Sequence, residues 1–258
     1  MKRTLGILIL LLVFRSYSQT NYFKSFDGTE ITYTDEGFGK AVLLVHGFIG
    51  SGASWEKTPL KSDLLEKGYR VVVPDLRGNG NSGKPQDDKA YQNEAEVKDL
   101  KELMSHLNTK EYYAVGYSRG SIVLANLLTK EPRIKKAVLG GMGIDFTNPD
   151  WDRRIMFMKA FAGNVTNETK DAVEYAKSIG ADLRSLHLQQ KYQPVTSIEE
   201  LEKLKAKILV IVGDQDKDNG NPQELHGVFK KSKLVIIPGT HNDAYKTVGF
   251  SKAILSFF

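Results

Sequence analysis

The chain has 258 residues, of which 41% are hydrophobic and 26% charged, a composition that excludes a disordered or fibrous protein. It has no cysteine, which excludes disulfides, thiolate zinc sites and cysteine nucleophiles. Its formal charge is +5, but residues 1–18 hold three of the 36 basic residues and none of the 31 acidic ones, so the remainder carries +2. That remainder has no dense basic stripe, and we expect no nucleic-acid partner.

The N-terminus has the pattern of an export signal. A basic start precedes an unbroken apolar run over residues 5–14, and small residues follow it. The run is too short to cross a bilayer comfortably as a helix. We predict that residues 1–18 are a signal peptide, cleaved near Gln19, so that the mature protein is periplasmic or secreted without stable membrane insertion. An uncleaved, membrane-anchored form is the alternative, because Arg15 directly follows the apolar run.

The next part of the chain alternates predicted strands with predicted helices. Two strands are expected first, joined by a turn at Asp27-Gly28. Six near-continuous apolar runs then indicate strands buried on both faces. Helical patterns separate them, for example at residues 94–107 and 121–128. The predicted strands are residues 22–26, 30–37, 41–47, 69–78, 112–118, 135–141, 207–214 and 233–239. This order predicts an α/β fold with a mostly parallel eight-stranded sheet and helices on both faces.

One interval between predicted strands is too long for a simple crossover. It is rich in aromatic, Met and Arg residues, and Pro149 and Pro194 lie near its edges. We predict that residues 145–195 form a small helical cap, and that residues 19–144 and 196–258 form the core domain. Four cap residues are candidates for apolar contacts at the pocket mouth, although packing onto the core would explain at least half of them: Trp151, Met156, Phe157 and Met158.

A serine flanked by glycines stands between a predicted strand and a predicted helix. Ser118 has Gly116 two residues before it and Gly120 two residues after it. This context is typical of a nucleophile elbow, a strained turn whose flanking residues approach too closely for a Cβ. The new helix would point its free N–H groups toward a developing oxyanion. The simpler interpretation is a tight turn with an N-cap serine.

A serine nucleophile needs a base, and the base needs an orienting acid. Among the five histidines, His241 follows the last predicted strand, at the edge of the sheet where functional groups collect. Asp214, Asp216 and Asp218 follow the penultimate strand, and one of them is the expected acid. Asp145, after an earlier strand, is the rival position.

The loop after the strand at residues 41–47 is expected to supply one oxyanion donor. We assign the two donors to the backbone N–H groups of Phe48 and Arg119. His46, at the end of that strand, is expected to have a structural role.

These segments resemble the α/β-hydrolase fold family over nearly the whole chain after residue 20. The resemblance rests on "LLVHGFIGSGASW", "VVPDLRGNGNSGKP", "VGYSRGS", "ILVIVGDQD" and "PGTHND", in that order. In the family the acid is usually the third residue after the strand-end glycine, which favours Asp216 here. The resemblance also implies a small cap and no metal or organic cofactor.

Two residues depart from the family pattern. Asn79 stands where the family commonly has a histidine, and Arg119 stands where an apolar or amide residue is usual. A guanidinium beside the nucleophile could pair with a cap carboxylate or with a substrate acid, and the sequence does not decide the role of the Arg119 side chain. The serine at position 118 argues against the dehalogenase and epoxide-hydrolase branches, where the resemblance would require an aspartate.

The sequence therefore predicts a serine hydrolase with Ser118, His241 and Asp216 as its triad, acting on a small-molecule carboxylic ester or related acyl compound. A C–C bond hydrolase or an aminopeptidase with the same triad is the first alternative. A non-catalytic binding protein on the same fold is the second, and the intact triad argues against it. The oligomeric state does not follow from the sequence.

Overall fold

The structure is a computed structural model that describes residues 20–258, so the predicted signal peptide lies outside the described residues. In this part of the chain, eight strands form one sheet in the order β1-β2-β4-β3-β5-β6-β7-β8. The pairs β1–β2 and β2–β4 are antiparallel, and the remaining pairs are parallel, which confirms the predicted fold class. The strands are β1 (Thr20–Lys24), β2 (Glu30–Glu36), β3 (Ala41–Val45), β4 (Arg70–Pro74), β5 (Tyr112–Tyr117), β6 (Ile134–Gly140), β7 (Lys207–Gly213) and β8 (Ser232–Ile237).

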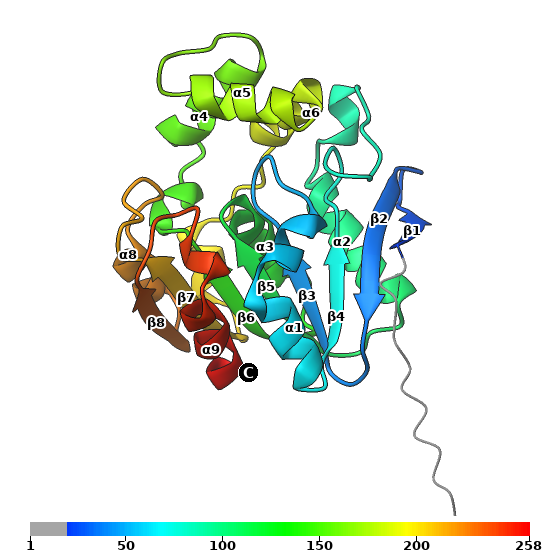
Figure 1. Cartoon of the computed structure of the whole chain (residues 1–258), viewed down its shortest axis with the longest axis vertical. Coiled ribbons are helices and arrows are strands. Elements are labelled where there is room, and N and C mark those ends of the chain that lie inside the picture. The colour runs from blue at the N-terminus through cyan, green and yellow to red at the C-terminus, as the bar shows by residue number, and fades with distance from the viewer. Residues whose placement is uncertain (1–19) are drawn as a thin grey trace, which may run out of the picture.

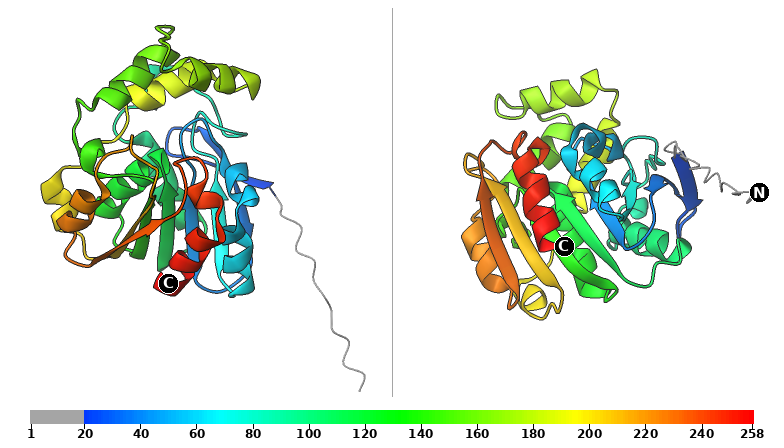
Figure 2. Two further views of the ribbon diagram at one scale, coloured as in Figure 1. Left: turned by 60° about the vertical axis from the view of Figure 1, so that its left-hand side comes forward. Right: turned by 60° about the horizontal axis from the view of Figure 1, so that its bottom comes forward.

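Helices cover both faces of this sheet, as Figures 1 and 2 show. The helices are α1 (Pro59–Glu66), α2 (Ala95–His106), α3 (Arg119–Lys130), α4 (Asp152–Phe161), α5 (Lys170–Ser178), α6 (Leu183–Lys191), α7 (Ile198–Glu202), α8 (Pro222–Val228) and α9 (Val248–Phe257). The sequence patterns located α2 and α3 to within two residues at each end.

The two faces of the sheet belong to two separate apolar clusters. Alternate residues of β3 show the division: Leu43 and Val45 pack in the cluster of α2, α3 and α8, whereas Val42 and Leu44 pack in the cluster of α1 and α9. All four side chains are fully buried. A strand buried on both faces reads as a continuous apolar run, which explains why the sequence reveals these strands so clearly.

The interval proposed as a cap contains α4, α5 and α6, which lie above the rest of the molecule in Figure 1. These helices share a third apolar cluster, which also contains Ile49 and Phe48 from the loop after β3. The interval is therefore packed onto the loop that begins at the carboxyl end of β3. We propose residues 145–195 as the bounds of the cap.

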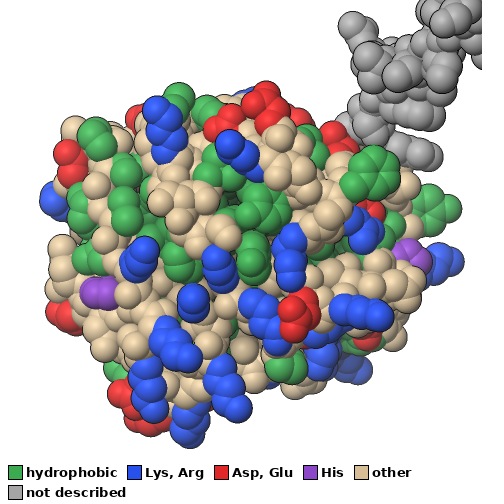
Figure 3. All heavy atoms as spheres, turned by 90° about the horizontal axis from the view of Figure 1, so that it is seen from below, with side chains coloured by type: hydrophobic (Ala, Val, Ile, Leu, Met, Phe, Trp, Pro, Cys, Tyr) green, Lys and Arg blue, Asp and Glu red, His purple; other side chains and the backbone are tan. Residues whose placement is uncertain are grey.

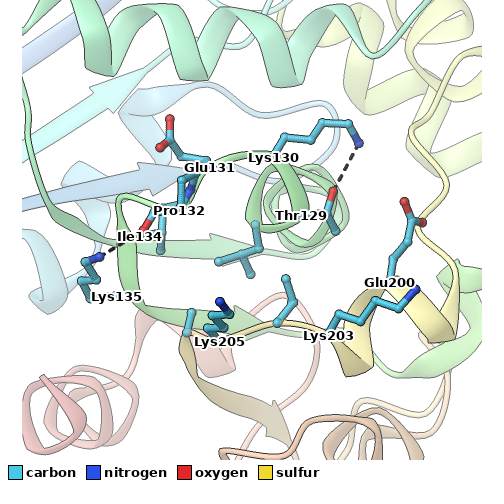
Figure 4. Close-up of a pocket in the computed structure, with 12 residues that line it drawn as sticks. Thr129, Lys130, Glu131, Pro132, Ile134, Lys135, Glu200, Lys203 and Lys205 are labelled. Carbon is cyan, nitrogen blue, oxygen red and sulfur yellow. Dashed lines mark hydrogen bonds between the residues drawn. The ribbon is translucent and has the colours of Figure 1, made fainter.

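The opposite end of the strands is rich in lysine, as Figure 3 shows from below. Lys135, Lys207 and Lys233 are exposed and lie at the starts of β6, β7 and β8 respectively. A groove of about 690 Å³ lies near them, lined by residues from the end of α3, the start of β6, and α7 with the segment that leads from it to β7 (Figure 4). Residues 20–258 contain no helix that is long and apolar enough to cross a membrane.

Candidate active site

Ser118 lies at the sharp turn between β5 and α3. Its backbone has φ 54° and ψ −128°, in the left-handed half of conformational space that non-glycine residues rarely adopt. Its N–H donates to the carbonyl of Gly140 at 2.8 Å, and its carbonyl accepts from Ser121 N–H at 2.8 Å, so the turn is held on both sides. The strained backbone therefore presents the hydroxyl at the carboxyl edge of the sheet, where the side chain is half-buried.

The two flanking glycines are required for different reasons. A Cβ on Gly116 would lie 2.5 Å from the Gly120 carbonyl oxygen, as expected from the close approach within the elbow. A Cβ on Gly120 would lie instead 2.3 Å from the carbonyl oxygen of Val45, on the neighbouring strand β3. Neither position has room for a Cβ, as predicted, and at Gly120 the nearest obstacle is β3.

The structure brings Ser118, His241 and Asp216 together from three separate loops. His241 Nε2 lies 2.9 Å from Ser118 Oγ, and His241 Nδ1 lies 2.6 Å from Asp216 Oδ2. The acid side chain is 2% exposed and the histidine side chain 22% exposed. The acid is thus sealed inside while the base and the serine stay accessible. A buried carboxylate on Nδ1 fixes the ring tautomer that leaves Nε2 free to accept the serine proton.

The rival carboxylates have other positions. Asp214 is exposed, and its Oδ1 accepts from Gly239 N–H at 2.9 Å, which ties the acid loop to the histidine loop. Asp218 is exposed. A Cβ on Gly220 would lie 2.8 Å from the Asp145 carboxyl, so Asp145 packs against the end of the acid loop. Among these four aspartates, Asp216 alone contacts His241 within the described structure.

Two further residues hold the triad, and the sequence patterns did not reveal them. Asn219 Nδ2 lies 2.7 Å from Asp216 Oδ1 and 3.0 Å from His241 Nδ1. Tyr117, adjacent to the nucleophile, donates its hydroxyl to the backbone carbonyl of His241 at 2.6 Å. Both residues contact His241 from a different loop, and no spacing along the chain reveals a contact of that kind.

The proposed oxyanion donors are the N–H groups of Phe48 and Arg119. Arg119 is the first residue of α3, so its N–H has no acceptor within the helix. Residues 47–50, which we call the oxyanion turn, are closed by a hydrogen bond from Gly50 N–H to the Gly47 carbonyl at 3.3 Å. A Cβ on Gly47 would lie 3.8 Å from Ser118 Oγ, so the turn abuts the nucleophile. Neither N–H donates a hydrogen bond within residues 20–258.

His46 has both ring nitrogens occupied. Its Nε2 accepts from Leu76 N–H at 3.0 Å, and its Nδ1 lies 2.8 Å from the Gly47 carbonyl, to which it donates. Burial lowers the pKa of His46 below its ordinary value, so the ring is neutral in the folded protein. These contacts support the structural role expected for it, because they join the oxyanion turn to the loop after β4.

The Arg119 side chain, whose role the sequence left open, is buried in the core and pairs with a carboxylate of α2. It is 3% exposed, and its two terminal nitrogens donate to the carboxylate of Glu96 in α2 at 2.8 and 2.5 Å. One of them also donates to the backbone carbonyl of Gln189 in α6 at 2.9 Å. The ion pair lies inside the core because α2 packs directly against α3.

Two of the four cap candidates pack against an apolar cluster, and the other two are half-buried without such an assignment. Trp151 packs against the cluster of α2, α3 and α8. Phe157 belongs to the cap cluster and meets Phe48 edge to face, with ring centroids 5.8 Å apart. Met156 and Met158 are half-buried. Phe157 is therefore the candidate that contacts a residue of the oxyanion turn.

The lysine-lined groove of Figure 4 is not part of this site. It lies at the amino ends of β6 and β7, whereas Ser118 follows the carboxyl end of the neighbouring parallel strand β5. The two sites are thus separated by the length of the sheet.

The chain resembles known proteins in sequence and in fold. The sequence model of the alpha/beta hydrolase fold family matches residues 40–157. A non-heme haloperoxidase of Rhodococcus erythropolis is 33% identical over 117 residues, which span 45% of this chain and 41% of that protein. The chain matches about two fifths of the length of such curated relatives.

Two solved structures agree over most of the chain. A bromoperoxidase from Bacillus anthracis has a TM-score of 0.72 at 24% identity, covering 93% of this chain and 99% of its own. An esterase from Exiguobacterium antarcticum has a TM-score of 0.72 at 20% identity, with the same coverage of 93% and 99%. At these identities the likeness concerns the fold. With its sheet order, its strand–serine–helix turn and a match of residues 40–157 to the model of the alpha/beta hydrolase fold family, the chain has the α/β-hydrolase fold.

Proposed function

We propose that the protein is a serine hydrolase that cleaves a carboxylic ester or a related acyl compound through an acyl-enzyme. One observation carries the proposal: a continuous hydrogen-bonded path leads from Ser118 Oγ through His241 to the buried carboxylate of Asp216. Such a path turns a weak hydroxyl nucleophile into a strong one, because the proton has somewhere to go as the new bond forms.

The reaction follows from these positions. Ser118 Oγ attacks the substrate carbonyl carbon while His241 Nε2 takes its proton. The carbonyl oxygen becomes an oxyanion between the N–H groups of Phe48 and Arg119, where the positive end of α3 also stabilises it. The C–O bond to the alcohol then breaks, and His241 protonates the leaving alkoxide. Water repeats the sequence on the acyl-enzyme, which releases the acid and restores Ser118.

A C–C bond hydrolase or an aminopeptidase would use the same three residues, and the relatives named as haloperoxidases add peroxide-dependent halogenation to the activities worth testing. Fold alone does not decide among these activities, since one fold hosts many. The serine at the elbow favours acyl chemistry.

A fluorophosphonate probe and a substrate panel test the proposal. The probe should label wild-type protein stoichiometrically at Ser118, and Ser118→Ala should abolish labelling and turnover while the far-UV spectrum stays native. The panel contains esters of short and long acyl chains, aminoacyl amides, vinylogous diketones, and halide with hydrogen peroxide. Ester turnover that persists in Ser118→Ala would refute the assignment, and turnover of amides or diketones alone would select the alternative.

We also propose that the protein is exported through residues 1–18. N-terminal sequencing of protein recovered from its host tests this, and an intact Met1 in the cytoplasmic fraction would refute it.

A further inference from the structure

The two residues that depart from the family pattern, Asn79 and Arg119, both contact one residue of α6. Gln189, in α6, donates through Nε2 to the Asn79 side-chain oxygen and to the Arg77 carbonyl, the latter at 2.7 Å. Its backbone carbonyl accepts from the Arg119 guanidinium at 2.9 Å. Gln189 is 1% exposed. Asn79 and Arg119 thus share a partner that lies in the proposed cap.

The hydrogen bonds through Asn79 lead to the turn that contains the first proposed oxyanion donor, the Phe48 N–H. Asn79 Nδ2 donates to the Gly50 carbonyl at 2.9 Å, and Gly50 closes the oxyanion turn through its N–H. Ile49 in this turn has φ 60°, a conformation that a β-branched residue holds only when its surroundings impose it. The contact with Asn79 is one such constraint. Two hydrogen bonds thus connect Gln189 Nε2 to the carbonyl of Gly50, which lies in the same turn as Phe48.

The hydrogen bonds of the Arg119 guanidinium involve the residue that supplies the second proposed oxyanion donor. The guanidinium is clamped between the Glu96 carboxylate and the Gln189 carbonyl. The same residue supplies the N–H at the start of α3. The clamp therefore fixes the far end of the side chain of the residue that supplies this N–H, and it joins that residue to α2 and α6.

We propose that Gln189 is a positioning residue that sets the separation of the two oxyanion donors from the cap. The inference rests on the proposed hydrolase function. The cluster leaves two buried atoms, Arg119 Nε and Gln189 Oε1, without a hydrogen-bond partner in the described structure. A buried network with unpaired polar atoms contributes little to stability. We therefore assign this network the role of positioning the oxyanion donors.

We call this positioning role of Gln189 the tether, and the kinetics of Gln189 variants test it. Gln189→Leu removes the Nε2 donor but keeps the backbone carbonyl, and Gln189→Glu keeps the shape while removing the donor. Both should lower kcat about 10- to 100-fold on every substrate with KM within about threefold, because displaced oxyanion donors act mainly in the transition state. Binding of a trifluoromethyl ketone, which forms the tetrahedral adduct, should weaken by a similar factor.

A matched control lies next in the sequence. Gln190 is buried on the same helix, and within residues 20–258 its side chain makes no hydrogen bond to Asn79, Arg119 or the oxyanion turn. Gln190→Leu should therefore keep kcat within about twofold. Asn79→Leu should reproduce the Gln189→Leu loss, and the double variant should lose little more than either single variant, since the two side chains act in one path.

The outcomes separate the two proposals. A wild-type protein that neither turns over esters nor reacts with the fluorophosphonate refutes the hydrolase. An active wild type refutes the tether alone if folded Gln189→Glu keeps full kcat, if Gln190→Leu loses as much, or if only KM rises. If both Gln189 variants fail to fold, Asn79→Leu decides: full kcat there also refutes the tether.

Discussion

Replacing Asp216 by Asn should disable the base while leaving the site intact. Asp216 Oδ2 lies 2.6 Å from His241 Nδ1, and the carboxylate is sealed from solvent. The amide of the variant has almost the same shape but no charge. It can also turn its NH₂ group toward Nδ1, which would move the ring proton to Nε2. A histidine with its proton on Nε2 cannot accept the proton of Ser118.

The expected magnitude is large. A neutral amide in place of the orienting acid lowers kcat by about 10⁴ in the serine-protease case, equivalent to about 5 kcal/mol of transition-state stabilisation. Asn219 already offers an amide beside both groups, at 2.7 Å from Asp216 Oδ1 and 3.0 Å from His241 Nδ1. The surroundings of Asp216 thus already accommodate an amide group. We therefore expect Asp216→Asn to change folding and KM little.

Steady-state kinetics on the best ester of the panel measure this effect, with Asp214→Asn as the control. Asp214 lies two residues away and bonds the Gly239 N–H on an exposed loop, so its variant should lose less than tenfold in kcat. Asp145→Asn and Asp218→Asn complete the series and should also retain most of their turnover. Near-normal kcat in Asp216→Asn together with collapse in Asp145→Asn would refute the reasoning and move the acid to the loop after β6.

Three further predictions follow from local packing and charge. Gly120→Ala should prevent stable folding or lower Tm by many degrees, because its Cβ would lie 2.3 Å from the Val45 carbonyl oxygen; a normal melting curve would contradict the close approach to β3. The free energy of unfolding should fall as the pH drops below about 6.5, because burial lowers the pKa of His46 and the unfolded chain binds the extra proton. Denaturant titrations across that range should show a smaller fall for His46→Asn, and identical slopes would count against this origin. Phe161→Ala should cost about 3 kcal/mol of stability as a buried aromatic, whereas Phe157→Ala, on the half-buried rim, should change acyl-chain preference more than stability. Equal losses in both variants, measured by denaturation and by the ester panel, would contradict this division.

The strands were readable from the sequence because a parallel strand covered on both faces must be apolar at every position. The run at residues 41–45 is such a case, with four of its side chains divided between the two core clusters. The elbow was readable for a related reason. Gly116 and Ser118 occupy backbone positions so restricted that few residue types fit them.

The position of the acid was partly readable. Three aspartates within five residues are equivalent as a pattern, and only a family resemblance favoured Asp216. The structure separates them by direction, because the loop turns one carboxylate inward to His241 and leaves Asp214 and Asp218 exposed.

What the sequence by itself determined is thus the local part of the protein: strands, helices, the strained serine turn and the types of its partners. These depend on the burial and backbone freedom of neighbouring residues, which a short window of sequence records. Only the tertiary structure decided the links among Gln189, Asn79 and Arg119, which lie 70 and 110 residues apart along the chain. A hydrogen bond between distant segments depends on how the cap packs onto the sheet, and no spacing rule along the chain encodes that contact.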